Sequence, residues 1–115
     1  MKKLAFIITL ILFIGLLSGL VMGCSFTKIG DILENFPQYE GKEVSIKGTV
    51  GETIWFALLE RGAYQVGDGS GNIWVVTSQP PPQEGKDVSI TGTVKAAFKL
   101  GERSLGKVII EADRN

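Results

Sequence analysis

The sequence predicts an all-β domain, a small five-stranded barrel preceded by a short helix. Two decapeptides, Gly41–Val50 and Gly85–Val94, are identical at eight of their ten positions. In both, apolar residues or glycine alternate with polar residues, which is the period of a strand with one buried face. The glycine inside each apolar row is typical of a bent strand or of a close backbone approach, as in small barrels. A third observation is the glycine-rich turn at 68–71 between two β-rich runs, which predicts a hairpin.

The N-terminal segment predicts export. Lys2 and Lys3 precede an apolar run from Leu4 to Val21, and Gly23 stands immediately before Cys24. This order is that of a signal peptide over residues 1–23. The Gly-Cys pair resembles the lipobox of prokaryotic lipoproteins, which implies lipid attachment at Cys24, with palmitate among the acyl chains. An uncleaved transmembrane anchor and ordinary secretion are the alternatives. All three place the domain outside the cytoplasm, and the lipoprotein interpretation places it on the membrane.

Composition narrows the function classes. Without residues 1–23 the chain has ten Lys and Arg against twelve Asp and Glu, a net charge of 10 − 12 = −2. Non-specific nucleic-acid binders usually carry a strongly positive balance. The chain has no His and a single Cys, so neither a Ser-His nor a Cys-His nucleophile pair can form. No acidic cluster has calcium-loop spacing. We therefore expect no catalytic residues, no metal and no cofactor.

The first half of the mature chain contains the expected helix and three strands. Residues 24–40 form the lipidated N-terminus and a short amphipathic helix over Lys28–Asn35, which Pro37 ends. The first strand covers 42–51, and a long, partly extended connection follows over 52–60 before a turn at Arg61-Gly62. The second and third strands cover 63–67 and 72–77.

The second half contains the expected remaining strands. Three consecutive prolines make 78–85 an extended arm, because proline lacks the N–H that a regular element needs. The fourth strand runs from Lys86 to about Phe98, a polar turn covers 99–104, and the fifth strand covers 105–112. Residues 113–115 are expected to be a frayed tail.

Residues 41–112 carry a resemblance to a known superfamily. Gly41-Lys-x-Val-x-Ile-x-Gly-x-Val50 followed by Tyr64-Gln-Val-Gly-Asp-Gly-Ser-Gly-Asn-Ile-Trp-Val75 resembles the OB-fold nucleic-acid-binding superfamily, especially its anticodon-binding type. The resemblance implies a five-stranded OB-fold Greek-key barrel. In that topology the first strand pairs with the second and the fourth, so the two decapeptides are expected to lie side by side and antiparallel.

The resemblance also implies a binding face. OB-folds bind ligands on strands two and three and the flanking loops. If Ile73 and Val75 point into the core, Trp74 and Val76 point outward by alternation. Trp74 then either stacks on a ligand or is covered by Trp55 or Phe56. The candidate binding face comprises Trp74, Val76, Gln65, Trp55, Phe56, Arg61, Lys47, Lys95 and Lys99.

Two loops have competing interpretations. The connection at 52–60 contains four large apolar residues, Trp55, Phe56, Leu58 and Leu59. These residues either extend the core or form an exposed patch that contacts a partner or a lipid surface.

The turn at 68–71 superficially resembles a phosphate loop, but no Lys-Ser/Thr and no helix follow it. Asp68 is therefore expected to hold its own turn through backbone hydrogen bonds.

Together these observations predict a membrane-anchored, extracytoplasmic OB-fold binding module without enzymatic activity, whose ligand is a protein or a small molecule. The alternative is a binder of single-stranded nucleic acid, in which Trp74 stacks on a base and Lys47, Lys95 and Lys99 contact phosphates. A third possibility is a domain that only packs against a protein of the cell envelope.

Overall fold

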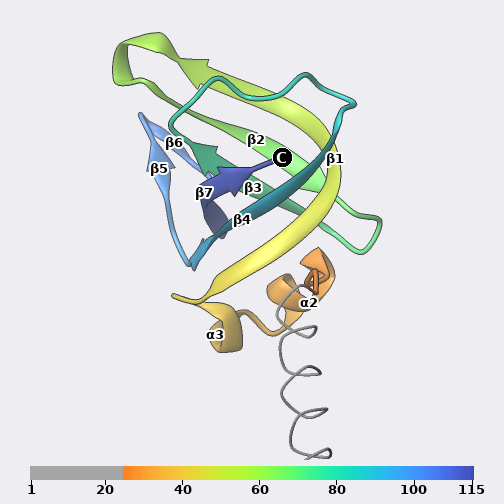
Figure 1. Ribbon diagram of the computed structural model, residues 1–115. Coiled ribbons are helices and arrows are strands. Elements are labelled where there is room, and N and C mark those ends of the chain that lie inside the picture. The colour runs from red at the N-terminus through yellow and green to blue at the C-terminus, as the bar shows by residue number, and fades with distance from the viewer. Residues whose placement is uncertain (1–24) are drawn as a thin grey trace, which may run out of the picture.

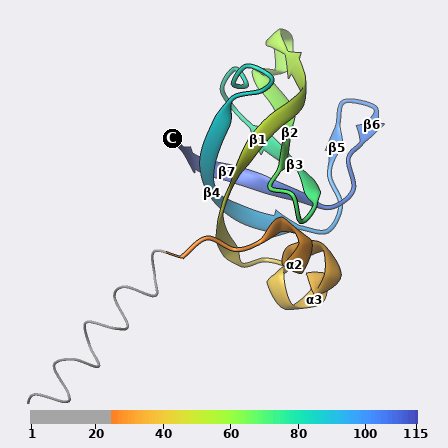
Figure 2. The same cartoon turned by 90° about the vertical axis from the view of Figure 1, so that its right-hand side faces the viewer.

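Five strands close into a barrel in the order β1-β2-β3-β7-β4. The structure is a computed structural model that describes residues 25–115 (Figures 1 and 2). The predicted signal peptide and Cys24 lie outside the described residues. The strands are β1 (Glu43–Phe56), β2 (Arg61–Gly67), β3 (Asn72–Thr77), β4 (Asp87–Lys95) and β7 (Val108–Arg114). β1 pairs with both β2 and β4, and β7 closes the barrel between β3 and β4. The predicted five-stranded OB-fold barrel is confirmed.

The two decapeptides are adjacent and antiparallel, as predicted. Ile46 pairs with Ile90, Gly48 with Val88, and Val44 with Gly92. Each glycine therefore faces a valine of the other copy, symmetrically about the isoleucine pair.

Both of these glycines are required by close backbone contacts. A Cβ atom on Gly48 would lie 2.4 Å from the carbonyl oxygen of Gly67, and one on Gly92 would lie 2.3 Å from that of Ile110. Such distances are too short for any side chain, so the neighbouring strands can approach only because these positions are glycine.

The first strand is longer than predicted. β1 continues through Phe56, a 3₁₀ turn covers Ala57–Leu59, and β2 begins at Arg61. The long, partly extended connection predicted over 52–60 is in fact the end of β1 followed by the 3₁₀ turn, and the predicted turn at Arg61-Gly62 is wrong. A bulge between Val50 and Thr53 lets pairing with β2 continue to Phe56. Glu60, with a φ of 47°, adopts the left-handed conformation that reverses the chain.

The C-terminal region also differs from the prediction. β4 ends at Lys95, and the expected polar turn forms a small hairpin of β5 (Lys99–Leu100) and β6 (Arg103–Ser104). β7 continues to Arg114. Asn115 exchanges two backbone hydrogen bonds with Ser89, so the predicted frayed tail is wrong.

Two short helices cover one end of the barrel. α2 (Ile29–Glu34) lies where the helix was predicted, but Pro37 lies in the first turn of a second helix, α3 (Phe36–Tyr39). Proline fits there because the first-turn N–H groups have no partner within a helix. Ile29, Ile32 and Phe36 are buried with the barrel side chains in one core. No helix within residues 25–115 is long and apolar enough to span a membrane.

Candidate functional site

The predicted binding face is the outer surface of β2 and β3, and β7 pairs with β3 beside it. In the strand register Gln65 lies opposite Trp74, Ala63 opposite Val76, and Trp74 beside Val108. Ala63 and Val108 are fully buried, and Val76 is only 3% exposed, although none of the three belongs to the core cluster inside the barrel. A second buried layer therefore lies outside the barrel wall.

The β5–β6 hairpin covers this layer. It lies beside β2, and Leu100 of β5 is buried. Arg103 of β6 places its guanidinium 5.2 Å from the ring centroid of Trp74, and its Nη1 lies 3.3 Å from Glu52 Oε1. Trp74 is half-buried, and the side chain that lies over its ring is Arg103 of this hairpin. Val76 points away from the core as predicted, yet its inclusion in an accessible face is wrong because the side chain is buried.

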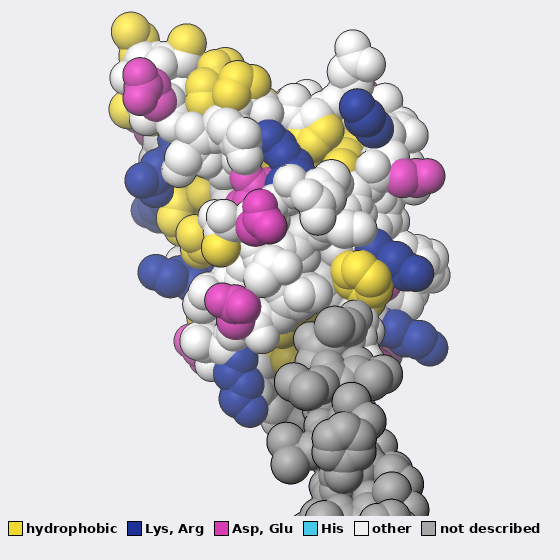
Figure 3. Space-filling view, viewed as in Figure 1, with side chains coloured by type: hydrophobic (Ala, Val, Ile, Leu, Met, Phe, Trp, Pro, Cys, Tyr) yellow, Lys and Arg dark blue, Asp and Glu magenta, His cyan; other side chains and the backbone are white. Residues whose placement is uncertain are grey.

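The β1–β2 hairpin carries the most exposed apolar side chains of the described residues apart from Phe26. Leu58 is 101% exposed, Leu59 58%, Phe56 39% and Trp55 36%. We call these four residues the apolar tip. Figure 3 shows hydrophobic side chains gathered at the upper left, where Figure 1 places the end of this hairpin. Of the two interpretations of this segment, the exposed patch is correct and the extension of the core is wrong.

The predicted basic residues do not converge. Lys47 lies opposite Ser89 on β4, and Lys95 ends that strand six residues further on, roughly 20 Å away at 3.3 Å per residue. Arg61 begins β2 near the apolar tip, and Lys99 lies in β5. These four exposed side chains come from four different strands, β1, β2, β4 and β5.

An open groove of about 530 Å³ adjoins Lys47. Its lining also includes Thr49, Asp68, Asp87 and Asn115. Thr49 Oγ1 donates a hydrogen bond of 2.9 Å to Asp87. The two carboxylates offset the single lysine, so the groove offers no concentrated positive charge to a phosphate.

Asp68 has a structural role at this end of the barrel. Its carboxylate accepts hydrogen bonds of 2.9 Å from the backbone N–H groups of Ile29 and Ser70. Partial burial acts to raise the pKa of Asp68, but the hydrogen bonds from Ser70, Ile29 and Gly71 outweigh it and hold the pKa below 3.8. The aspartate fixes its own turn, as predicted, and also joins that turn to the start of α2, which the sequence pattern did not show.

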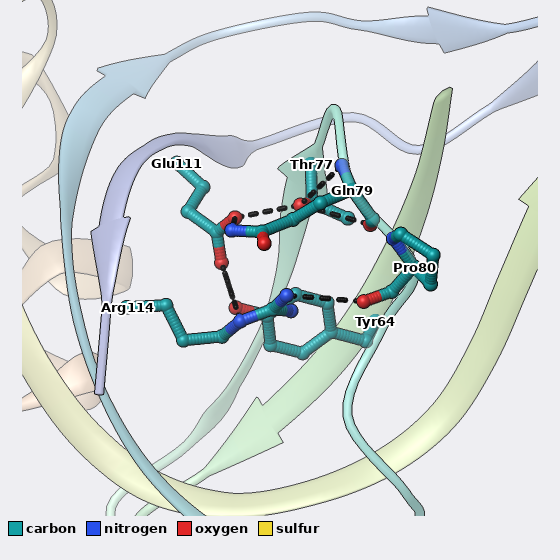
Figure 4. A network of polar contacts seen from close by, with 6 residues as sticks. All are labelled: Tyr64, Thr77, Gln79, Pro80, Glu111 and Arg114. Carbon is teal, nitrogen blue, oxygen red and sulfur yellow. Dashed lines mark hydrogen bonds and ion pairs between the residues drawn. The ribbon is translucent and has the colours of Figure 1, made fainter. Parts of the chain in front are cut away.

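A buried polar network lies between β2, β3, β7 and the proline arm (Figure 4). Tyr64 donates its hydroxyl hydrogen bond to Glu111 Oε1, and Thr77 Oγ1 donates one of 2.6 Å to Oε2. Arg114 Nε lies 3.6 Å from Glu111, and Arg114 Nη2 donates to the carbonyl oxygen of Pro80 at 3.0 Å. The side chain of Glu111 is only 4% exposed. The network closes the barrel and ties β7 to the arm.

This network is structural in character. Arg114 Nη1 is buried without a hydrogen-bond partner, and the guanidinium lies 5.4 Å from the ring centroid of Tyr64, so the aromatic face is its neighbour. Burial, followed by the hydrogen bond to Glu111, raises the pKa of Tyr64 well above its ordinary value of 10.0. Within residues 25–115 no group of three potential metal ligands occurs.

Comparison with known proteins supports the fold but does not identify a function. No protein-family model matches the chain, and no curated protein matches it. Among solved structures, asparaginyl-tRNA synthetase from Pyrococcus horikoshii complexed with asparaginyl-adenylate superposes with a TM-score of 0.62 at 16% identity, over 80% of this chain and 22% of that one. A second structure of that enzyme gives a TM-score of 0.54 at 19% identity, over 69% of this chain and 20% of that one.

A shorter protein is also similar. The OBody AM3L09 bound to hen egg-white lysozyme has a TM-score of 0.52 at 20% identity, over 68% of this chain and 83% of that one. At these identities the likeness shows the OB-fold alone. The present chain spans about a fifth of the synthetase chains.

Proposed function

We propose that this protein is a non-enzymatic OB-fold binding module, held on the outer side of a cell membrane by lipid on Cys24, and that it binds a partner protein through the apolar tip. The observation that carries the proposal is the exposure of Trp55, Phe56, Leu58 and Leu59 on one hairpin. Aromatic and aliphatic residues of this kind supply most of the binding energy in protein interfaces.

The position of the tip favours a protein partner. The tip lies at the end of the barrel remote from α2 and α3, and α2 begins at Ile29, soon after Cys24 (Figures 1 and 2). A chain tethered at Cys24 would therefore direct the tip away from its own membrane. The charges beside the tip balance, since Glu52 is paired with Arg103 and Glu60 adjoins Arg61, so no excess of positive charge attracts an anionic lipid surface. The likeness to an OBody bound to lysozyme supports the same interpretation, since an OB-fold of this shape can recognise a protein.

Nucleic-acid binding is the second candidate, favoured by the likeness to asparaginyl-tRNA synthetase and by the anticodon-binding resemblance of the sequence. It requires Trp74 to be available for stacking, and here Arg103 lies over that ring. A titration of the protein with a single-stranded oligonucleotide at increasing salt tests it. Binding that weakens steeply with salt supports this candidate, whereas the absence of salt-dependent binding excludes it.

Site-specific photo-crosslinking tests the proposed function. A photo-reactive residue replaces Leu58 in the full-length chain, and Gln38 in α3 is the matched control because it is also exposed but lies away from the tip. After irradiation of intact cells, we expect a protein adduct from position 58 and none from position 38. Equal adducts from both positions, or none from position 58, would contradict the proposal.

A further inference from the structure

We infer that the barrel itself rests on the membrane that anchors it, and that Phe26, Lys28 and Lys47 contact the lipid headgroups. We call these three residues the lipid-contact patch. The inference rests on the proposed attachment at Cys24 and specifies how the domain sits on its membrane. It does not depend on which protein the apolar tip binds.

The chain is joined to the barrel almost from its first described residue. The N–H group of Thr27 donates a hydrogen bond of 2.8 Å to the carbonyl oxygen of Ser45 in β1. Two residues later, the N–H group of Ile29 donates one of 2.9 Å to Asp68. The side chain of Ile29 is fully buried. From Thr27 onward the chain is therefore part of the folded domain and does not serve as a free tether.

The tether that remains is very short. Only Ser25 and Phe26 separate Cys24 from Thr27. Because two residues of extended chain span at most about 7 Å, Phe26 lies within that distance of Cys24 along the backbone. The headgroup region on each side of the hydrocarbon core is roughly 5–8 Å thick. Lipid on Cys24 would therefore hold Phe26 at the level of the headgroups.

The side chains of the patch suit a lipid surface. Phe26 is 46% exposed, and among the described residues it is the one exposed large apolar side chain outside the apolar tip. Lys28 and Lys47 are also exposed, and Lys47 Nζ lies 5.2 Å from the centroid of the Phe26 ring. An aromatic ring with lysines beside it can enter the headgroup region while the amines contact phosphates. Figure 3 shows basic side chains beside a hydrophobic one at the lower right of the barrel, on the side where Figure 1 places α2.

The apolar and basic members of the patch are both needed. Asp31 of α2 is exposed near Lys28 in the sequence, so the excess of positive charge is small. The lysines alone would therefore bind an anionic surface weakly, and the ring of Phe26 adds apolar contact. This composition differs from that of the apolar tip, where the charges balance. The two exposed apolar sites of the domain thus fit two different surfaces.

Quenching of tryptophan fluorescence by brominated lipids tests this inference. The full-length lipidated chain is reconstituted into vesicles of phosphatidylcholine and phosphatidylglycerol, with or without bromine on the acyl carbons nearest the headgroups. One chain reports from the patch through Phe26→Trp, with Trp55→Phe and Trp74→Phe as its background. A second chain carries Trp74→Phe alone and reports from the apolar tip through Trp55.

Charge reversals separate contact of the barrel with lipid from simple closeness to the anchor. Lys28→Glu and Lys47→Glu are introduced into the chain that carries Phe26→Trp. Lys28→Glu leaves Lys47 beside the ring, so its effect does not arise from loss of that contact. The matched control is Lys99→Glu, which changes an exposed lysine of β5. Equal unfolding midpoints for the three variants exclude a loss of fold as the cause.

We expect the tryptophan at position 26 to be quenched and Trp55 to be unaffected. Each reversal in the patch should lower the ratio of docked to undocked barrels at least about fivefold, and Lys99→Glu should not change it. Equal quenching in all three variants, or none at position 26, overturns the inference and leaves the proposed function standing. Quenching of Trp55 overturns both. Absence of a protein adduct at Leu58 contradicts only the proposed partner of the tip.

Discussion

The hydroxyl of Tyr64 donates a hydrogen bond to the buried carboxylate of Glu111, across 47 residues of sequence. The pair joins β2 to β7 inside the barrel and gives the carboxylate one of its few partners. A buried acceptor that loses a donor incurs the full cost of its desolvation. This contact is therefore expected to control both the stability of the barrel and its response to alkaline pH.

Tyr64→Phe should lower the free energy of unfolding at pH 7 by about 1–3 kcal/mol, because Glu111 loses a donor. The raised pKa of Tyr64 means that the folded state favours the protonated phenol. Its contribution is fully present below pH 10 and is lost as the pH rises above that value. The difference between wild type and Tyr64→Phe in urea unfolding should therefore narrow above pH 10. A difference that stays constant with pH would contradict the assigned role of the phenol.

Gly48→Ala and Gly92→Ala should each destabilise the barrel by about 1–3 kcal/mol or more, because the added methyl group overlaps a backbone carbonyl of the next strand. Gly51→Ala is the matched control in β1. Its added Cβ would lie 3.6 Å from the nearest atom, an ordinary contact. Chemical denaturation should leave this control within about 1 kcal/mol of wild type. Equal effects at the three positions would refute the close-approach explanation.

Leu100→Ala should loosen the β5–β6 hairpin from Trp74. Trp55 and Trp74 are the only tryptophans, so a Trp55→Phe background reports on Trp74 alone. Acrylamide quenching of Trp74 should increase. The free energy of unfolding should fall by less than the ~2–5 kcal/mol of a typical core Leu→Ala change, because the barrel interior is intact. Unchanged quenching would show that Leu100 does not hold the cover in place.

Asp68→Asn should weaken the junction between the β2–β3 turn and α2. The carboxyl has a lowered pKa in the folded state, so its contribution is present above pH 3.8 and is lost as the pH falls below that value. Wild type should therefore be more stable than Asp68→Asn at pH 7, with a difference that shrinks in acid. Asp113→Asn serves as an exposed control. A direct NMR titration that placed the Asp68 midpoint above 3.8 would contradict the hydrogen-bond assignment.

Local patterns predicted the scaffold well. The repeated decapeptide identified two adjacent strands because its pattern of alternating apolar and polar residues, with a glycine in the apolar row, is typical of a bent strand with one buried face. The turn at Asp68 was predicted for the same reason. The extension of β1 was missed because apolar and polar residues do not alternate over residues 53–59. Where a strand projects beyond the barrel, its two faces have similar surroundings, so the sequence shows no alternating pattern.

Contacts distant in sequence could not be predicted. Glu111 and Arg114 lie in a segment that resembles the end of an ordinary strand. Nothing in the sequence around them indicates that they contact Tyr64. The cover over Trp74 was missed because residues 99–104 have the polar composition of a turn, with Leu100 as their one apolar member. Val76 was consequently assigned to an open surface that the hairpin occupies.

The most direct test of the central claim is cysteine labelling in intact cells with a membrane-impermeant maleimide. Leu58→Cys at the apolar tip is compared with Gln38→Cys in α3, and the parent chain measures any labelling of Cys24. The proposed location outside the membrane predicts that Gln38→Cys is labelled, and the proposed protein partner at the tip predicts that Leu58→Cys is protected. Equal labelling of the two positions would contradict a covered tip, and no labelling of either would contradict the extracytoplasmic location.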